Sequence, residues 1–194
     1  MLYKELFKRH CDSQIEFLYL GMAYNDKIDW ELIEIGDERH VPIIPIDFFE
    51  RVSEILQAKH VPKNAKLYVS HNHPNKEQGV PSSNDYLFTH SVNRLLNSIG
   101  RTIEDHYIIC QENKFCFSFK DFDLMDDFLF SSNMTPEQYL IFNREYCLHM
   151  LNYLKPWSDG KEYDILTNNE QFYNEQLYIM RTQDNTTASS HWWL

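Results

Sequence analysis

Apolar residues near the start of the chain fall into two runs of strand length. Residues 15–24 read IEFLYLGMAY, and residues 28–35 read IDWELIEI. The polar pair Asn25-Asp26 lies between these runs and favours a turn. The pattern therefore predicts a β-hairpin in this part of the chain.

Helical spacing begins after Pro45. Apolar residues then recur on one face of a helix, at Phe48, Phe49, Val52, Ile55 and Leu56. We expect Asp47 to cap this helix, because Glu50 lies three residues further on and completes a capping box.

The centre of the chain repeats the order of strand and helix. Residues 66–70 read KLYVS, which predicts a strand that runs into His71. A second helix is predicted from Ser83, and its apolar stripe consists of Leu87, Val92, Leu95 and Leu96. Residues 106–110 and 115–119 then predict another hairpin.

The C-terminal part of the chain has a helical pattern from Lys120 onward. Thr135 is followed by Pro136, which suits the first helical position, and by Gln138 three residues after the threonine. This combination predicts a capped helix start. A last helix is predicted over residues 168–181.

The balance of charged residues bears on whether the chain binds nucleic acid. The 194 residues include 18 Lys and Arg against 29 Asp and Glu, and the formal net charge is −11. Proteins that bind the phosphate backbone of a nucleic acid need clustered basic residues, because the release of counterions supplies most of the binding affinity. The acidic balance therefore argues against nucleic acid as the partner.

The expected location is the cytoplasm. The N-terminus lacks the apolar run of a signal peptide, and no stretch approaches the roughly 20 apolar residues of a membrane helix. The four cysteines are scattered, and we expect them to stay reduced in that compartment.

The residues with the most chemical information follow the central strand. His71 and His73 are two positions apart, so on an extended segment both imidazoles point to the same face. Asp85, at the start of the next predicted helix, can supply a third ligand. Two nitrogens and one carboxylate oxygen suit zinc, and three protein ligands leave a fourth position for water. Zinc lowers the pKa of such a water and polarises a scissile carbonyl.

Each of these residues also has an ordinary structural explanation. A lone His-x-His occurs by chance on many strands. Ser82 and Ser83 can be helix caps, and Asp85 can be a first-turn acid that the helix dipole stabilises. That explanation accounts for the serines and the acid. It does not account for two histidines at the end of a buried strand, so the combination favours a metal site.

His-x-His followed by Ser-x-x-Asp resembles the signature of the JAMM (MPN+) metalloproteases. HNHP at residues 71–74 and PS-x-x-D at residues 81–85 are closer to the RadC-like branch of that family. The resemblance includes the early strand pair ending at Gly36 and the helix start at residues 45–49. It covers roughly residues 10–120.

The resemblance implies an α/β fold of the cytidine deaminase-like JAB/MPN type. In that fold a mixed β-sheet is flanked by helices, and zinc lies at a strand end. Residues 1–120 would form a RadC-like JAMM (MPN+) metalloprotease domain. Residues 121–194 would form a C-terminal helical extension of unknown role.

The resemblance also implies roles for further residues. A glutamate on an upstream strand would be the general base, and Glu31 has the expected offset from Gly36, with Glu34 as the alternative. Ser82 resembles the family serine whose hydroxyl stabilises a tetrahedral intermediate. The segment between the second histidine and this serine is one residue longer than usual. His106 matches a family position without an assigned role.

The implied function is that of a zinc-dependent hydrolase, a peptidase or isopeptidase of the JAMM type. Many relatives cut after the C-terminal tail of ubiquitin or a ubiquitin-like protein, so we expect such a protein or its conjugate as the substrate, in deconjugation or precursor processing. Two alternatives are a non-catalytic protein-binding MPN-type module and a DNA-repair-associated RadC-like accessory protein. The complete ligand set argues against the first, and the acidic charge argues against the second.

Overall fold

The computed structural model describes Leu6 and residues 8–10, 14–38, 40–74, 81–110, 115–125, 135–154 and 161–189 of the chain. The chain divides into two compact units, Met1–Asp127 and Phe128–Leu194. None of the helices in the described ranges has the length and apolar character needed to cross a membrane. Three of the four cysteines lie in these ranges and are free thiols, while Cys11 lies outside them.

The first unit is built on a five-stranded sheet with the strand order β2-β1-β3-β4-β5. The strands are β1 (Phe17–Tyr24), β2 (Lys27–Ile35), β3 (Lys66–His73), β4 (Ile103–Cys110) and β5 (Phe115–Ser118). β1 is antiparallel to both β2 and β3, β3 and β4 are parallel, and β5 is antiparallel to β4. The predicted class, a mixed sheet with flanking helices, is confirmed.

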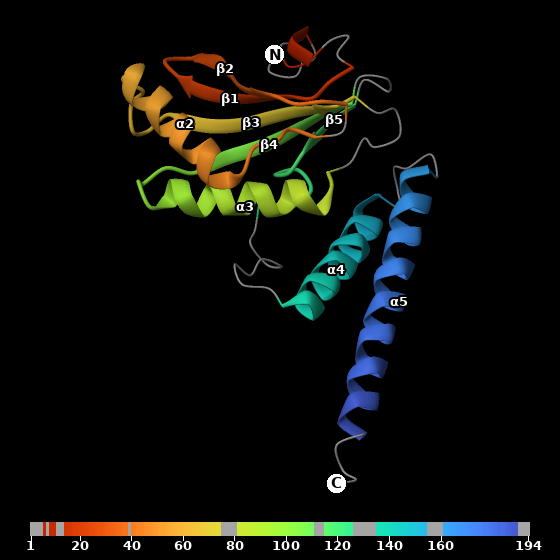
Figure 1. The fold of residues 1–194 in the computed structure, drawn as a ribbon. Coiled ribbons are helices and arrows are strands. Elements are labelled where there is room, and N and C mark those ends of the chain that lie inside the picture. Colours follow the sequence, from red (N-terminus) through yellow and green to blue (C-terminus); the bar gives the residue numbers. More distant parts are fainter. Residues whose placement is uncertain are drawn as a thin grey trace. The chain divides into compact units, whose positions relative to one another are not determined.

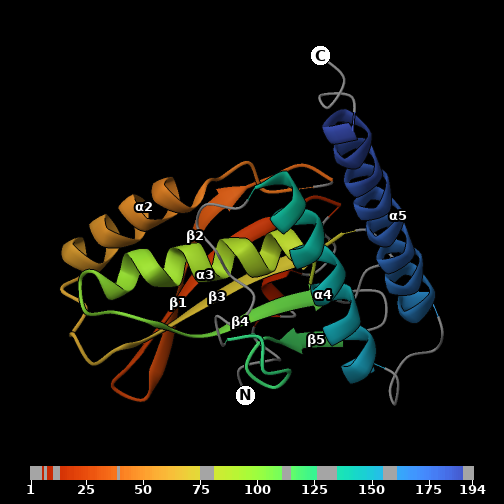
Figure 2. The same cartoon turned by 90° about the horizontal axis from the view of Figure 1, so that it is seen from below.

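Helices α2 (Pro45–Ala58) and α3 (Ser83–Asn97) lie on the same face of this sheet (Figures 1 and 2). The main core lies between them and the strands, and it includes Leu20, Val52, Leu67, Val69 and Leu96. A smaller cluster on the opposite face joins Leu6 to Trp30, Tyr107 and Ile109. The sheet therefore presents alternate side chains of each strand to two different environments.

The predicted N-terminal hairpin is confirmed. Asn25 and Asp26 have φ values of 51° and 60°, and two central residues with positive φ are typical of the type I′ turn that suits hairpins. The predicted cap of α2 is wrong. The helix begins at Pro45, its N-cap is Ile44, and no side chain caps it. The fixed φ of proline suits the first helical position, so Asp47 lies inside the first turn.

The second unit contains α4 (Pro136–Leu154) and α5 (Lys161–Ser189), which pack against each other. The predicted capped start of α4 is confirmed, because the Gln138 N–H donates to Thr135 Oγ1 (3.2 Å) and the Thr135 N–H donates to Gln138 Oε1 (2.8 Å). α5 is longer at both ends than the predicted last helix. Residues 120–125 form turns rather than a helix, and Asp123 has a φ of 53°.

Gly21 provides a test of how β1 packs against β2. Gly21 pairs with Trp30, and a Cβ atom at Gly21 would lie 2.7 Å from two carbons of the indole. We expect Gly21→Ala to lower the free energy of unfolding by about 1–3 kcal/mol, because the buried indole has to move. Urea denaturation measures the change. In a Trp30→Leu background the same alanine should cost much less, and an equal cost in both backgrounds would contradict the steric explanation.

Candidate metal centre

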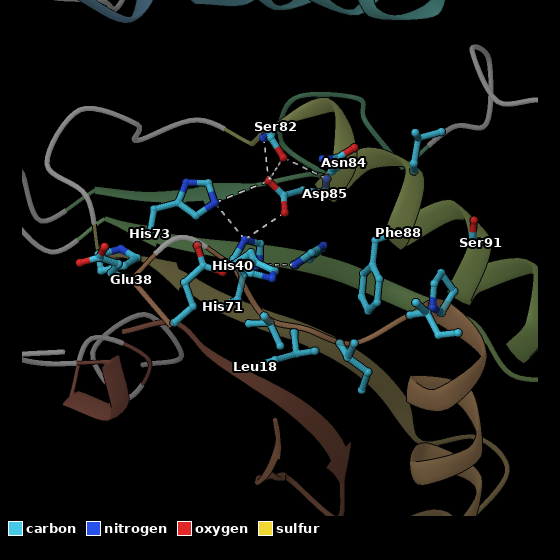
Figure 3. Close-up of a pocket in the computed structure, with 18 residues that line it drawn as sticks. Leu18, Glu38, His40, His71, His73, Ser82, Asn84, Asp85, Phe88 and Ser91 are labelled. Carbon is cyan, nitrogen blue, oxygen red and sulfur yellow. Dashed lines mark hydrogen bonds and ion pairs between the residues drawn. The ribbon is translucent and has the colours of Figure 1, made fainter. Parts of the chain in front are cut away.

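The site begins on β3, the middle strand of the sheet. His71 and His73 are two residues apart and both point toward α3 (Figure 3). Asn72, between them, points to the opposite face, where it bonds to the Ile15 carbonyl. The exposed fractions of His71 and His73 are only 4% and 9%. The regular alternation of an extended strand thus brings two imidazoles together in a nearly dry environment.

The first turn of α3 supplies a carboxylate to the same place. Ser82 is the N-cap and Asp85 is the third helical residue, and the two form a capping box. The Ser82 hydroxyl and backbone N–H both donate to Asp85 Oδ2, at 2.7 and 2.6 Å, and the Asp85 N–H donates to Ser82 Oγ at 3.2 Å. These bonds fix the carboxylate and leave Oδ1 facing His71.

The three candidate ligands fit a tetrahedral metal ion. Nε2 of His71 lies 3.0 Å from Nε2 of His73 and 3.2 Å from Asp85 Oδ1, and Nε2 of His73 lies 3.5 Å from Asp85 Oδ2. Zinc holds nitrogen and oxygen ligands at about 2.0–2.2 Å, so two ligands of a tetrahedral site are about 3.3–3.6 Å apart. Among the described residues, these three form a His/Cys/Asp/Glu group that could hold a metal ion.

Electrostatics keep the carboxylate ionised. Burial alone would raise the pKa of Asp85, but the neighbouring His71 and His73 hold this pKa well below its ordinary value. An ionised carboxylate beside two imidazoles is the form that a cation needs.

A second carboxylate, that of Glu16, lines the same pocket. It immediately precedes β1, whose Leu18 pairs with His71 of β3. Its exposed fraction is 8%, and it lines the same pocket as His71, His73 and Asp85. Burial raises the pKa of Glu16, and the nearby histidines oppose this increase in part. A carboxyl group with a raised pKa is suited to accept and release a proton.

The backbone of Glu16 is held at both of its polar groups. Its N–H donates to the carbonyl of Asp37 (2.8 Å), and its carbonyl accepts the N–H of Gly36 (2.8 Å). A Cβ atom at Gly36 would lie 2.2 Å from the carbonyl oxygen of His40. Glycine is therefore required just after the end of β2, where the backbone bonds to Glu16 and comes close to His40.

The side chain of Asn72 forms hydrogen bonds with the backbone of the two residues on either side of Glu16. Its Oδ1 accepts the Phe17 N–H (2.8 Å), and its Nδ2 donates to the Ile15 carbonyl (2.9 Å). The buried His10 lies 3.0 Å from Asn72 Oδ1 through Nδ1 and 3.0 Å from Ser70 Oγ through Nε2. Burial lowers the pKa of His10 to about 3. The residue between the two candidate ligands thus fixes the segment that carries Glu16.

Glu31 and Glu34 are not brought to this site. Both lie on β2, which is separated from β3 by β1. Glu31 is paired with Lys59, and Glu34 is paired with Arg51 at 2.9 Å. Neither residue lines the pocket. Sequence reasoning missed Glu16, although a single acid at the head of an apolar run was an available signal.

The pocket has a volume of about 640 Å³ and runs away from the histidines along α3. Its apolar wall consists of Leu18, Val41, Ile43, Ile44, Leu87 and Phe88. Polar groups therefore gather at one end of a mainly apolar depression, the usual arrangement of a site that orients a ligand.

His106 on β4 contacts the outer side of His71. Its Nε2 lies 2.8 Å from His71 Nδ1, and its Nδ1 lies 2.6 Å from the hydroxyl of Thr89 on α3. That hydroxyl lies 2.6 Å from the backbone carbonyl of Asp85 and donates to it. His106, which had no role in the sequence pattern, is therefore connected directly to His71 and through Thr89 to the backbone of Asp85.

Comparison with known proteins gives two matches. The model of the family described as "RadC-like JAB domain" matches residues 5–124. A "UPF0758 protein" of Aquifex aeolicus (strain VF5) is 30% identical over 115 residues. That alignment covers 59% of this chain and 45% of the relative, so the chain spans about half the length of that protein. The match to the family model includes every residue of the site described above.

Ser82 provides a test of the local geometry. Ser82→Ala removes the N-cap of α3, and we expect the free energy of unfolding of the metal-free protein to fall by about 1 kcal/mol. Ser83→Ala, one position further on, is the matched control and should have a smaller effect. Chemical denaturation measures both, and equal losses would show that the capping box does not hold this end of the helix.

Proposed function

This chain belongs to the family of RadC-like JAB domains, and on that basis we propose that it is a zinc-dependent peptidase or isopeptidase. The observation that carries the proposal is the convergence of His71, His73 and Asp85, with Glu16 in the same pocket. A site for structure alone needs no buried proton acceptor beside the ligands, and it usually closes the metal with a fourth protein ligand.

The chain's own residues fit the zinc ion. His71, His73 and Asp85 would hold it, because their donor atoms already have separations close to those of a tetrahedral site. When bound, zinc would supply a Lewis acid that activates water and polarises the scissile carbonyl.

Glu16 would act as the general base in place of Glu31. Its carboxylate is buried at the pocket wall, and its raised pKa brings it closer to the working pH of a base. It would accept a proton from the attacking water and release it to the departing amine. Asn72 and Gly36 would hold the backbone of Glu16 during both steps.

Ser82 would stabilise the negative charge that develops on the carbonyl oxygen. Its hydroxyl lines the pocket and donates to Asp85 Oδ2, which also accepts the Ser82 backbone N–H. Because the backbone bond would continue to hold the carboxylate, the hydroxyl proton could turn toward the substrate.

The proposed substrate is a ubiquitin-like protein or its conjugate, cleaved after its C-terminal tail. The apolar wall formed by residues 41–44 and α3 supports this proposal, because an extended tail can lie along such a wall. Backbone hydrogen bonds hold extended peptides in register at sites of this kind.

Zinc binding is the first test. We expect about one zinc per chain by elemental analysis, and His71→Ala and His73→Ala should each remove most of it because two ligands hold the ion poorly. His60→Asn is the control, since His60 is exposed and its φ of 51° is one that asparagine tolerates. Full zinc content in both alanine variants would contradict the assignment.

The second test separates the two glutamates. Glu16→Gln should retain zinc but lower the rate of cleavage by about 10²- to 10⁴-fold, because an amide cannot accept the proton. Glu31→Gln should cleave at the wild-type rate. The assay uses a ubiquitin-like protein joined through its C-terminus to a short peptide or to a lysine side chain, with products identified by mass spectrometry.

The outcomes distinguish the alternatives. If Glu31→Gln loses cleavage while Glu16→Gln retains it, the assignment of the base is wrong. If the zinc-loaded wild type cleaves neither type of bond but binds the ubiquitin-like protein, a binding module replaces the enzyme. Tight binding to DNA in a gel shift at physiological salt would favour the DNA-repair accessory instead.

A further inference from the structure

Thr89, His106 and His71 form a continuous chain of hydrogen bonds that ends at the candidate metal position. The Thr89 hydroxyl lies 2.6 Å from the Asp85 carbonyl and 2.6 Å from His106 Nδ1, and His106 Nε2 lies 2.8 Å from His71 Nδ1. The other ring nitrogen of His71 is the candidate ligand atom.

Thr89 determines which group donates in each of these hydrogen bonds. The Asp85 carbonyl oxygen can only accept, so the Thr89 proton must lie between the two oxygens, which are 2.6 Å apart. The hydroxyl oxygen is then left to accept from His106. His106 therefore carries a proton on Nδ1.

The donor in the remaining hydrogen bond, between His106 and His71, follows from the chemistry of imidazole. A neutral His106 with its proton on Nδ1 has a bare Nε2, which can only accept. The proton between His106 and His71 must then belong to His71 Nδ1. In a neutral His71, Nε2 is then left without a proton, and it faces His73 and Asp85.

We propose that Thr89 and His106 are positioning residues that select the metal-binding tautomer of His71. This inference rests on the proposed zinc site and extends it to two residues that contact no zinc. Neither residue touches the reacting atoms, so both act through His71. Groups that orient a metal-binding histidine in this way typically change metal affinity by about 10- to 100-fold.

Burial makes the selection effective. The exposed fractions of Thr89, His106 and His71 are 0%, 1% and 4%, so bulk water has little access to replace a missing partner. Without the Thr89 hydroxyl, the proton of His106 has no acceptor on Nδ1 and is better placed on Nε2. His71 would then accept on Nδ1 and carry its own proton on Nε2, where Asp85 Oδ1 accepts it. Zinc would have to displace that proton.

The experiment compares Thr89→Val with Thr89→Ser. Valine has nearly the shape of threonine but no hydroxyl, whereas serine keeps the hydroxyl and lacks the methyl group. Zinc affinity is measured by competition with a chromophoric chelator. We expect valine to weaken binding by about 10- to 100-fold and serine to stay within about threefold of the wild type. Wild-type affinity in the valine variant, or an equal loss in both variants, would overturn the proposal.

A second measurement reports the tautomer without zinc or substrate. Long-range ¹H–¹⁵N spectra of the metal-free protein distinguish protonated from bare ring nitrogens in each histidine. The wild type and Thr89→Ser should show His71 and His106 protonated on Nδ1, and Thr89→Val should show both protonated on Nε2. A loss of packing alone would lower stability without exchanging the tautomers.

This measurement also separates the two proposals. If the wild type has the expected tautomers but binds no zinc, the proposed function fails while the hydrogen-bond direction stands. If the wild type binds zinc but its metal-free His106 is protonated on Nε2, the zinc site stands and the positioning role is wrong. If the valine variant does not fold, the wild-type spectrum alone shows which ring nitrogens of His71 and His106 carry the protons, and so decides the proposal.

Discussion

Successive side chains of β3 point to opposite faces of the sheet, and the rest of the site depends on this two-residue period. His71 and His73 face α3, while Asn72 between them faces the N-terminal residues and holds the chain on both sides of Glu16. Since β3 lies between β1 and β4, each neighbour adds one group: Glu16 comes from the residue just before β1, and His106 comes from β4.

The helix side of the site obeys a different constraint, which is the need to satisfy buried polar groups. The N-terminus of α3 has backbone N–H groups without partners in the helix, and Ser82 and Asp85 satisfy them reciprocally. One turn later, Thr89 uses the carbonyl of Asp85. The same turn of helix therefore holds the carboxylate in place and anchors the hydrogen-bond chain through His106.

Features that depend on residues close together in the sequence could be predicted from the sequence. The spacing of His71, His73 and Asp85, the turn at Asn25-Asp26 and the cap at Thr135 each depend on residues close together in the chain. Glu16 depends instead on the register of β1 against β3, which pairs Leu18 with His71. No nearby residue specifies that register, because it is decided by how the whole sheet packs. An offset counted along the chain from Gly36 pointed to Glu31, which lies on β2 and is separated from the strand of the histidines by β1.

His73 and Asp85 are anchored separately, the first by its place in β3 and the second by the capping box of α3. Because each anchor acts by itself, the convergence of the three donor groups does not depend on the length of the connection between β3 and α3. Insertions and deletions in this connection are therefore compatible with an unchanged donor set. Over evolutionary time such a segment can diverge in length and composition while the donor set itself is inherited unchanged.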